Sequence, residues 1–246
     1  MQALRGIVVA AIVVAGCGGA AGTTAPGTTT PTAAAAATPA TTPAARPTAA
    51  PTSACGPVLR MTDLLPAGSY CIDSRLGVAI DVPEGWGTCC GGVILKDDFT
   101  GLLYADVTQV VVYHDACLWS SGQTEPEGAA AIAAALSKQR PREGSAPRDV
   151  TVAGLPGYHV RLTVPADQPV TGGSDQNFTG CDAGQFRSFK AGIDGLRYHQ
   201  GPSQVDDFYL VDIGASTVVF DVVTGPQITA AEQAELDGML ASLEVR

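Results

Sequence analysis

A stretch of 37 residues, positions 18–54, limits the part of this chain that can fold. It contains 14 Ala, 11 Thr, 6 Pro, 4 Gly, one Ser and one Arg, and it lacks aromatic and large aliphatic side chains. Such a composition cannot bury enough apolar surface to offset the conformational entropy lost on ordering. We therefore expect a disordered tether here and a single folded domain over residues 55–246, which is long enough to bury an ordinary core.

The charge of the expected domain excludes one class of partner. The chain has 14 Lys and Arg residues against 24 Asp and Glu residues. Arg5 and Arg46 precede the domain, so the domain itself holds 12 basic and 24 acidic side chains, a net charge of −12. Binding to a phosphate backbone needs concentrated positive charge, so we expect no nucleic-acid partner.

Residues 1–16 have the pattern of a signal peptide. Arg5 precedes the apolar run Gly6–Gly16, which is too short to cross a bilayer core of about 30 Å but suits the apolar region of an export signal. The next residues, Val-Ala-Gly-Cys at positions 14–17, resemble the lipobox of bacterial lipoproteins. The resemblance implies cleavage before Cys17 and attachment of lipid to its thiol. The expected partner is then the cell membrane, reached through a lipid anchor at Cys17 and the tether 17–54, on the extracytoplasmic face.

Six cysteines remain in the expected domain, and an exported domain with an even number of them favours three disulfides. Two are adjacent in sequence and too close at Cα to pair readily, which leaves twelve possible pairings open. Zinc binding at the adjacent pair is the alternative, but no second ligand pair at finger-like spacing is present. We therefore expect no metal and no cofactor. The six candidates are Cys55, Cys71, Cys89, Cys90, Cys117 and Cys181.

The hydrophobic pattern of the domain predicts mostly strands, because runs of β-branched and aromatic residues alternate with breakers. Gly214 and its neighbours predict a hairpin between the last two strands. The predicted strands are Leu76–Pro83, Gly92–Lys96, Asp106–His114, Asp149–Ala153, Gly157–Val164, Phe186–Lys190, Asp207–Ile213 and Thr217–Val223.

Two helices are expected between and after these strands. The first begins at Thr124, where Thr124-Glu125-Pro126-Glu127 has the order of a capped N-terminus, and runs to about Gln139. The second begins at Thr229 by the same logic and ends near Ser242. Helices separated by runs of strands predict an α+β domain, mostly antiparallel sheet flanked by two helices.

The sequence lacks the common catalytic motifs. G-x-S-x-G, H-E-x-x-H, a P-loop and G-x-G-x-x-G are all absent. The doublets Asp97-Asp98 and Asp206-Asp207 are interpreted as solvated strand ends, because neighbouring side chains of a strand point apart. These patterns favour a protein that is not an enzyme.

One cluster could nevertheless bind a ligand. Arg197, Tyr198, His199 and Gln200 precede Gly201-Pro202, and we expect them to face Asp182, Gln185 and Arg187 if the Cys181 region lies alongside. Such a set could bind sugars or carboxylates. A buried polar network that pins a loop to the sheet explains the same residues and is the preferred interpretation. Of the other two histidines, His159 is expected to be partly buried in a strand and His114 to lie at the surface.

The order of elements resembles the Mog1/PsbP-like fold, which bacterial lipoproteins of the actinobacterial LpqN type share. The resemblance is carried by Val-Pro-Glu-Gly-Trp at 82–86, Val-Ala-Gly-Leu-Pro-Gly-Tyr at 152–158, the late hairpin and the closing Ser-Leu-Glu-Val at 242–245. It implies an α/β/α sandwich over most of residues 70–246. Members of this fold mostly bind partners, so no reaction is implied.

A closer resemblance is to uncharacterised actinobacterial exported proteins with C-x-W, C-D-x-G-x-F-R-S and R-Y-H-Q-G-P, here at 117–119, 181–188 and 197–202. It implies a disulfide between Cys117 and Cys181. Cys55 and Cys71 would then pair with Cys89 and Cys90 in one of two orders.

These observations predict a lipid-anchored, extracytoplasmic lipoprotein that binds an unknown protein or small-molecule ligand without catalysing a reaction. Two alternatives remain open. The chain could be an enzyme that modifies envelope glycans or lipids through the surroundings of His199 and Asp182. It could also be a structural spacer.

Overall fold

A computed structural model describes residues 55, 57–59, 62–89, 92–97, 99–172, 177–192 and 195–246. All of them belong to one compact unit, Ala50–Arg246. The predicted signal peptide, the lipidation site Cys17 and the tether lie outside the described residues, as do Cys90 and the side chain of Cys89. In the part of the chain that is described, no helix has the length and apolar character needed to span a bilayer.

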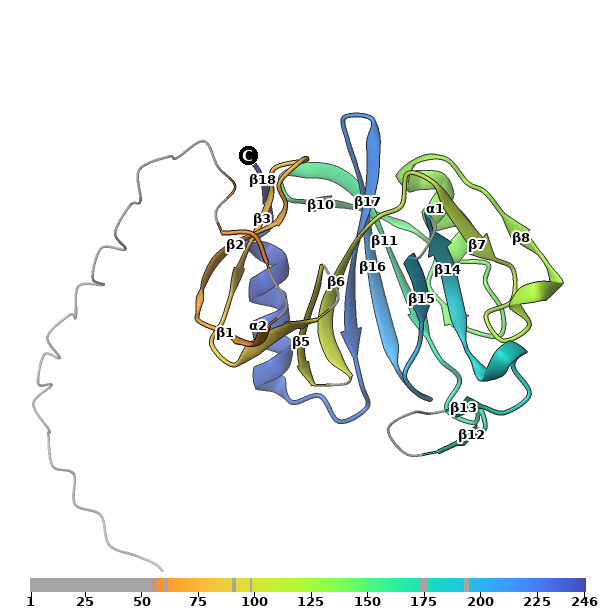
Figure 1. The fold of residues 1–246 in the computed structure, drawn as a ribbon. Coiled ribbons are helices and arrows are strands. Elements are labelled where there is room, and N and C mark those ends of the chain that lie inside the picture. The colour runs from red at the N-terminus through yellow and green to blue at the C-terminus, as the bar shows by residue number, and fades with distance from the viewer. Residues whose placement is uncertain are drawn as a thin grey trace, which may run out of the picture. The chain divides into compact units, whose positions relative to one another are not determined.

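A nine-stranded sheet forms the centre of this unit (Figure 1). Neighbouring strands pair antiparallel throughout, as the alternating sequence pattern predicts for sheets joined by hairpins. In spatial order the strands are β1 (Thr62–Leu65), β4 (Trp86–Cys89), β5 (Val93–Asp97), β6 (Thr100–Asp106), β17 (Ser216–Thr224), β16 (Val205–Ile213), β11 (Leu155–Thr163) and β10 (Arg148–Val152), with β9 (Glu143–Gly144) also paired to β11.

Three smaller sheets accompany the central one. The four-stranded sheet has the order β15 (Gly195–Tyr198), β14 (Arg187–Ala191), β7 (Val110–Tyr113) and β8 (Gln123–Thr124). The three-stranded sheet has the order β18 (Glu244–Val245), β3 (Val78–Val82) and β2 (Gly68–Asp73), and β12 (Val170–Thr171) pairs with β13 (Asn177–Phe178). Two short 3-10 turns, η1 (Trp119–Ser121) and η2 (Asp182–Gly184), flank the four-stranded sheet.

Both faces of the central sheet are covered, which gives the predicted α/β/α arrangement. Along β17, Val218 and Phe220 point to one face and Val219 to the other, because successive strand residues alternate. The first face packs against helix α2 (Ala230–Ala241) and the three-stranded sheet. The second packs against helix α1 (Gly128–Leu136) and the four-stranded sheet. The α+β class and the mostly antiparallel sheet are confirmed.

The predicted capping is correct for one helix and wrong for the other. At α2, the Thr229 side chain accepts from the backbone N–H of Glu232, and the Glu232 side chain accepts from the N–H of Thr229. Helix α1 instead follows Glu127, which makes no side-chain cap. Thr124 instead belongs to β8 and lies opposite Val112 of β7. Its backbone is therefore paired with a neighbouring strand and does not begin the helix.

Of the predicted strand Asp106–His114, only Val110–Tyr113 forms a strand of its own, β7, and Asp106 is the last residue of β6 in a different sheet. Asp106 ends β6, and its carboxylate accepts hydrogen bonds from the backbone N–H and the hydroxyl of Thr108, so the chain turns before β7. Strands β1, β2, β4 and β15 were not predicted, and neither was β6 apart from its last residue. The two-residue strands β8, β9, β12, β13 and β18 were also missed. The hairpin between β16 and β17 is confirmed, with Gly214 at a φ of +61° in the turn.

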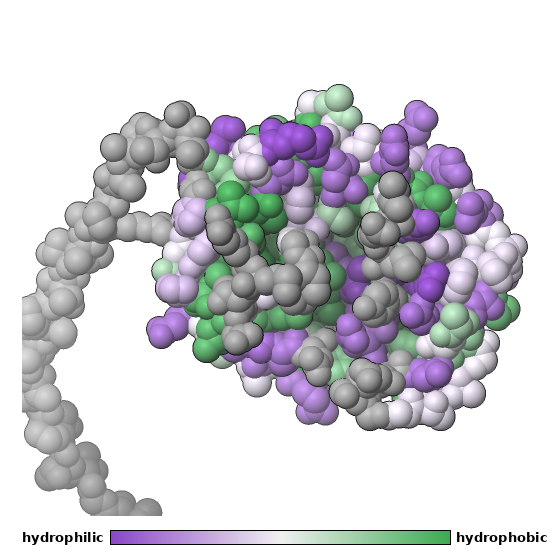
Figure 2. Space-filling model, viewed as in Figure 1, coloured by the Kyte–Doolittle hydropathy of each residue, from purple (hydrophilic) through white to green (hydrophobic). Residues whose placement is uncertain are grey.

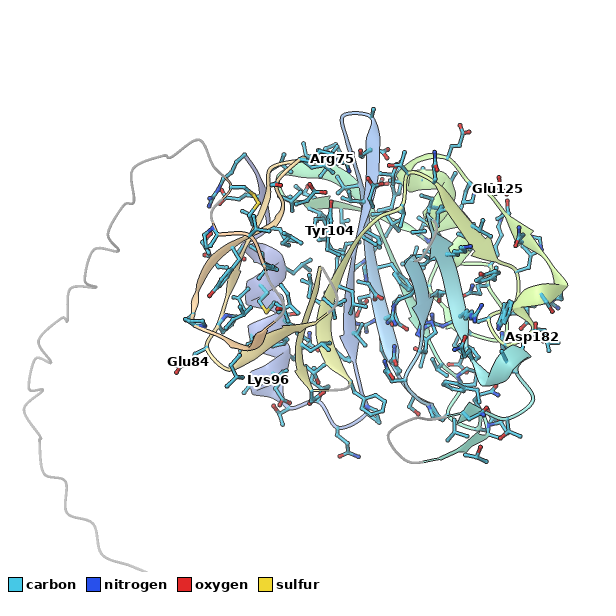
Figure 3. All side chains as sticks on the ribbon, in the orientation of Figure 1. Arg75, Glu84, Lys96, Tyr104, Glu125 and Asp182 are labelled. Carbon is cyan, nitrogen blue, oxygen red and sulfur yellow. A yellow bond between two sulfur atoms is a disulfide. The ribbon has the colours of Figure 1, made fainter. Side chains whose placement is uncertain are left out.

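The three-stranded sheet is tied to the central sheet by polar contacts near the Arg75 and Tyr104 labels of Figure 3. The Tyr104 hydroxyl donates to Asp73 Oδ2 at 2.6 Å, and Arg75 Nη2 lies 2.5 Å from Asp106 Oδ2. These contacts join the turn after β2 to the end of β6.

Two disulfides lie within the described residues. Cys117 is joined to Cys181, the pair that the resemblance implies. Cys55 is joined to Cys71, so the expectation that each of these would pair with Cys89 or Cys90 is wrong. Cys71 lies on β2, and its backbone N–H donates to the Pro57 carbonyl, which holds the Cys55 segment along the strand.

Candidate functional site

The most buried charges of the domain converge on Asp206 of β16. Its carboxylate is completely buried and accepts hydrogen bonds from the guanidinium groups of Arg142 and Arg197, one on each oxygen. Gln204 Nε2 donates to Oδ1 at 2.8 Å. Burial alone would raise the pKa of Asp206, but the neighbouring cations and His199 hold it well below its usual range.

A second buried carboxylate extends this network to the next strand. Arg197 Nε lies 2.5 Å from Asp221 Oδ2, so one guanidinium on β15 bridges carboxylates on β16 and β17. The other oxygen of Asp221 has no hydrogen-bond partner among the described residues. Burial, followed by the nearby charge of Asp206, outweighs Arg197 and raises the pKa of Asp221 to about 7.

His199 fills the space between these charges. Its Nδ1 lies 3.0 Å from Asp206 Oδ2, and its Nε2 lies 2.8 Å from Ser188 Oγ and 3.2 Å from Arg142 Nη1. Burial and the adjacent cations lower the pKa of His199 to about 3, so the ring is neutral at physiological pH. With both nitrogens engaged, the imidazole has none free for proton transfer to a ligand. The preferred interpretation, a buried polar network, is what the structure shows for Arg197 and His199.

Several members of this network were missed by sequence reasoning. Arg142, which follows Arg140-Pro141, also donates to the Ser188 hydroxyl at 2.7 Å and to the Leu162 carbonyl at 3.0 Å. Gln139 donates to the carbonyls of Tyr113 and Ser188. A charged residue in a connecting segment is ordinarily expected to be exposed to solvent. The local sequence therefore gives no sign that Arg142 is buried.

The interpretation of Asp206-Asp207 as solvated strand ends is wrong. Both carboxylates are buried, one on each face of the central sheet, since neighbouring strand residues point in opposite directions. Asp207 contacts His159 and Arg161 on the face opposite the network. His159 is buried in its strand, as predicted.

A second cluster lies at the surface beside the Cys117–Cys181 disulfide. The Arg187 guanidinium carbon lies 3.8 Å from the centre of the Trp119 ring, and Arg187 Nε donates to Gln185 Oε1 at 2.8 Å. Asp182, labelled in Figure 3 at the η2 turn, accepts from the backbone N–H and the hydroxyl of Ser120 at 2.8 and 2.5 Å. These hydrogen bonds lower the pKa of Asp182.

Leu118 adds an exposed apolar group to this cluster, with 48% of its surface accessible to solvent. Figure 2 shows mostly hydrophilic and neutral residues over the β7, β8 and β14 side of the drawn face, and more hydrophobic residues over the β1 to β5 side. We name the cluster the Trp119 surface; its members are Leu118, Trp119, Ser120, Asp182 and Arg187.

A small apolar core separates the Trp119 surface from the buried network. Phe178 and Phe186 pack there against the Cys117–Cys181 disulfide. The centres of the Phe186 and His199 rings are 5.7 Å apart in an edge-to-face contact. The backbone N–H of His199 donates to the backbone carbonyl of Phe186. Arg187 at the start of β14 therefore points outward, and its two neighbours, Phe186 and Ser188, point inward.

The structure divides the predicted binding residues into two groups. Arg197 and His199 lie in the buried network, whereas Asp182 and Arg187 lie on the Trp119 surface with Gln185. Gln200 is partly buried, and its backbone N–H donates to Gln204 Oε1. Tyr198 is paired with Arg187 in the β14–β15 register, and its side chain lies outside the described part. The expected single cluster is therefore not formed.

No group of three or more His, Cys, Asp or Glu side chains suited to a metal ion occurs among the residues that the structure describes. In the buried network, arginine donates to both oxygens of Asp206 and to Oδ2 of Asp221.

The chain was compared with family models, curated proteins and solved structures. No family model matches the chain, and no curated protein matches it. A structural comparison finds the solution structure of cyanobacterial PsbP (CyanoP) from Synechocystis sp. PCC 6803, with a TM-score of 0.34 and 14% sequence identity. The match covers 76% of this chain and 95% of that one.

Proposed function

We propose that this chain is a lipid-anchored, extracytoplasmic lipoprotein that binds a protein or small-molecule ligand without catalysing a reaction, and that it binds at the Trp119 surface. One observation carries the binding part of the proposal. The Arg187 guanidinium lies 3.8 Å over the Trp119 ring, next to Leu118, which is half exposed.

This arrangement has the physical properties of a binding hot spot. Trp and Arg contribute most to the affinity of protein interfaces, particularly where they are already held in place. Arg187 is fixed by the Trp119 ring and by Gln185, and η1 is fixed by Asp182. Little side-chain entropy is then lost when a partner binds.

The anchor is supported by the lipobox-like residues 14–17, the apolar run before them and the long tether after them. The disulfides Cys55–Cys71 and Cys117–Cys181 agree with an oxidising compartment outside the cytoplasm. A tether of 37 residues would let the domain reach partners away from the membrane surface.

The geometry of the histidines argues against the enzyme alternative. His199 is buried with both ring nitrogens engaged, and Asp182 faces Ser120 at the surface, so the two do not form an acid–base pair. His159 likewise has both nitrogens engaged, by Arg148 and Asp207. A general base needs a nitrogen within reach of the substrate proton.

The anchor is tested by metabolic labelling with radioactive palmitate, with and without globomycin, an inhibitor of lipoprotein signal peptidase. We expect labelled mature protein that begins at Cys17, and unprocessed precursor when globomycin is present. A chain that incorporates no palmitate and keeps the same mass in both cultures would contradict the anchor. The Cys17→Ala variant is the matched control.

Binding is tested by photo-crosslinking in intact cells with benzoylphenylalanine in place of Leu118. The control carries the same probe in place of Glu84, which is exposed on a distant turn (Figure 3). We expect a discrete adduct from position 118 alone, which Trp119→Ala reduces at least fivefold. No adduct, or equal adducts from both positions that Trp119→Ala leaves unchanged, would contradict binding at this surface and favour the spacer alternative.

A further inference from the structure

A second polar cluster lies on the other face of the central sheet, away from the buried network. It is built on three neighbouring strands, with Arg148 on β10, His159 and Arg161 on β11, and Asp207 and Tyr209 on β16. The antiparallel register places Arg148 opposite His159, His159 opposite Tyr209, and Arg161 opposite Asp207. The five side chains therefore share one face and one corner of the sheet.

His159 is the fixed centre of this cluster. It is 4% exposed, and its ring lies 4.6 Å from that of Tyr209. Its Nδ1 accepts from Arg148 Nε at 2.8 Å, and its Nε2 lies 2.6 Å from Asp207 Oδ1. These two contacts, one on each ring nitrogen, fix the orientation of the imidazole. Arg148 is thus held beside Nδ1, and the Asp207 carboxylate beside Nε2, of one imidazole.

Arg161 is linked to His159 through Asp207. Its Nε and Nη2 donate to the two oxygens of Asp207 at 2.9 and 2.7 Å, a bidentate pair. Burial alone would raise the pKa of Asp207, but the hydrogen bonds from His159 and Arg161 lower it, so the carboxylate stays ionised. Among these five side chains, two guanidinium groups therefore lie beside one carboxylate, in a domain of net charge −12.

Several hydrogen-bond donors of the cluster have no acceptor among the described residues, and the two arginines that carry most of them are exposed to solvent. The Arg161 side chain is 60% exposed, and Arg148 is exposed as well. Among the described residues, none accepts a hydrogen bond from the terminal nitrogens of Arg148 or from Nη1 of Arg161. The Tyr209 hydroxyl is a further donor with no described acceptor, and burial raises the pKa of Tyr209 so that it keeps its proton.

We infer that Arg148, Arg161 and Tyr209 form a binding site for a phosphate group, with His159 and Asp207 as its buried positioning residues. Donors from Arg148, held by His159, and from Arg161, held by Asp207, suit a tetrahedral oxyanion with three or four acceptor oxygens better than a planar carboxylate with two. The negative charge of Asp237 on α2 acts near Tyr209 and would repel a phosphate there. The attraction for phosphate therefore comes from Arg148 and Arg161. This site is separate from the Trp119 surface and does not depend on the function proposed there.

Calorimetric titration of the full-length protein in a non-ionic detergent tests the site. The probes are inorganic phosphate, acetate, and glycerophosphoglycerol, the deacylated headgroup of phosphatidylglycerol, all at one ionic strength. The variants are Arg148→Gln and Arg161→Gln. Arg246→Gln is the matched control, because Arg246 is exposed and its side chain contacts Glu244 and Ser69, away from the cluster. Thermal unfolding with and without phosphate is measured on each variant, since a bound ligand raises the melting temperature only where the site is intact.

We expect saturable one-to-one binding of phosphate, at least tenfold weaker in Arg148→Gln and Arg161→Gln and unchanged in Arg246→Gln, with acetate bound more weakly. Tighter binding of glycerophosphoglycerol than of inorganic phosphate would identify a lipid headgroup as the ligand, and the reverse order would identify free phosphate. No saturable binding of either phosphate probe, or equal loss in all three variants, would overturn the inference. A folded variant whose melting temperature still rises with phosphate as the wild type's does would also overturn it.

Discussion

Arg197 Nε lies 2.5 Å from Asp221 Oδ2, and this contact joins the four-stranded sheet to the central sheet inside the protein. The same guanidinium also donates to Asp206, so one side chain from β15 is fixed to both β16 and β17. Buried ion pairs of this kind add little net stability compared with apolar packing, but removal of one partner leaves an uncompensated charge. The network therefore sets how the two sheets fit together.

The opposite pKa shifts of Asp221 and His199 predict an unusual pH dependence of stability. The pKa of Asp221 rises from 3.8 to about 7, so its contribution to stability falls as the pH rises from about 4 to about 7. The pKa of His199 falls from 6.5 to about 3, so its contribution falls as the pH drops from 6.5 to about 3. Between pH 4 and 6.5 the two effects oppose each other.

Asp221→Asn removes one of the two effects. Relative to the wild type, we expect its free energy of unfolding to increase as the pH rises from 4 to 7, by up to about 1.4 kcal/mol per pH unit. Urea unfolding across this range measures the difference. A difference that stays constant with pH would show that Asp221 does not take up its proton in the folded state near neutral pH.

The two described disulfides should differ in their effect on stability. Cys117 and Cys181 are separated by 64 positions, and Cys55 and Cys71 by 16. Loop-closure entropy then predicts losses of about 4 and about 3 kcal/mol when each pair is replaced by serine. Urea unfolding of the two double variants tests this order, and a larger loss for the Cys55–Cys71 pair would contradict it.

The capping box of α2 gives a local prediction. Thr229→Ala removes the side-chain oxygen that accepts from Glu232, and we expect a loss of about 1 kcal/mol in the free energy of unfolding. Thr229→Ser keeps that oxygen and should restore most of the loss. Thr124→Ala should leave α1 intact, because Thr124 does not cap it. Equal effects of Ala and Ser at position 229 would contradict the capping role.

The fold could be predicted from the sequence where the pattern is local. The hairpin around Gly214 and the cap at Thr229 depend on neighbouring residues alone, and both were predicted correctly. Strands such as Thr62–Leu65 and Trp86–Cys89 are short and are fixed by their partners in the sheet. Their own residues carry no clear alternation, so they were missed.

The candidate site was only partly accessible from sequence for a related reason. The sequence around Arg197 and His199 was recognised as a motif. Their burial, however, depends on ion pairs with residues of other segments, namely Arg142, Asp206 and Asp221. Trp119 was noted only as part of a cysteine motif, and its contact with Arg187 requires β14 to pair with β7. Contacts between distant segments leave no trace in the spacing of either segment.

The central claim is that Arg197 holds the two sheets together and that ligand binding takes place elsewhere, at the Trp119 surface. The free energy of unfolding of Arg197→Gln in urea tests it most directly, because the change leaves Asp206 and Asp221 buried without their shared cation. We expect a loss of about 3–5 kcal/mol. Stability within about 0.5 kcal/mol of the wild type, together with loss of the crosslink from position 118, would contradict the claim and make Arg197 a ligand-binding residue.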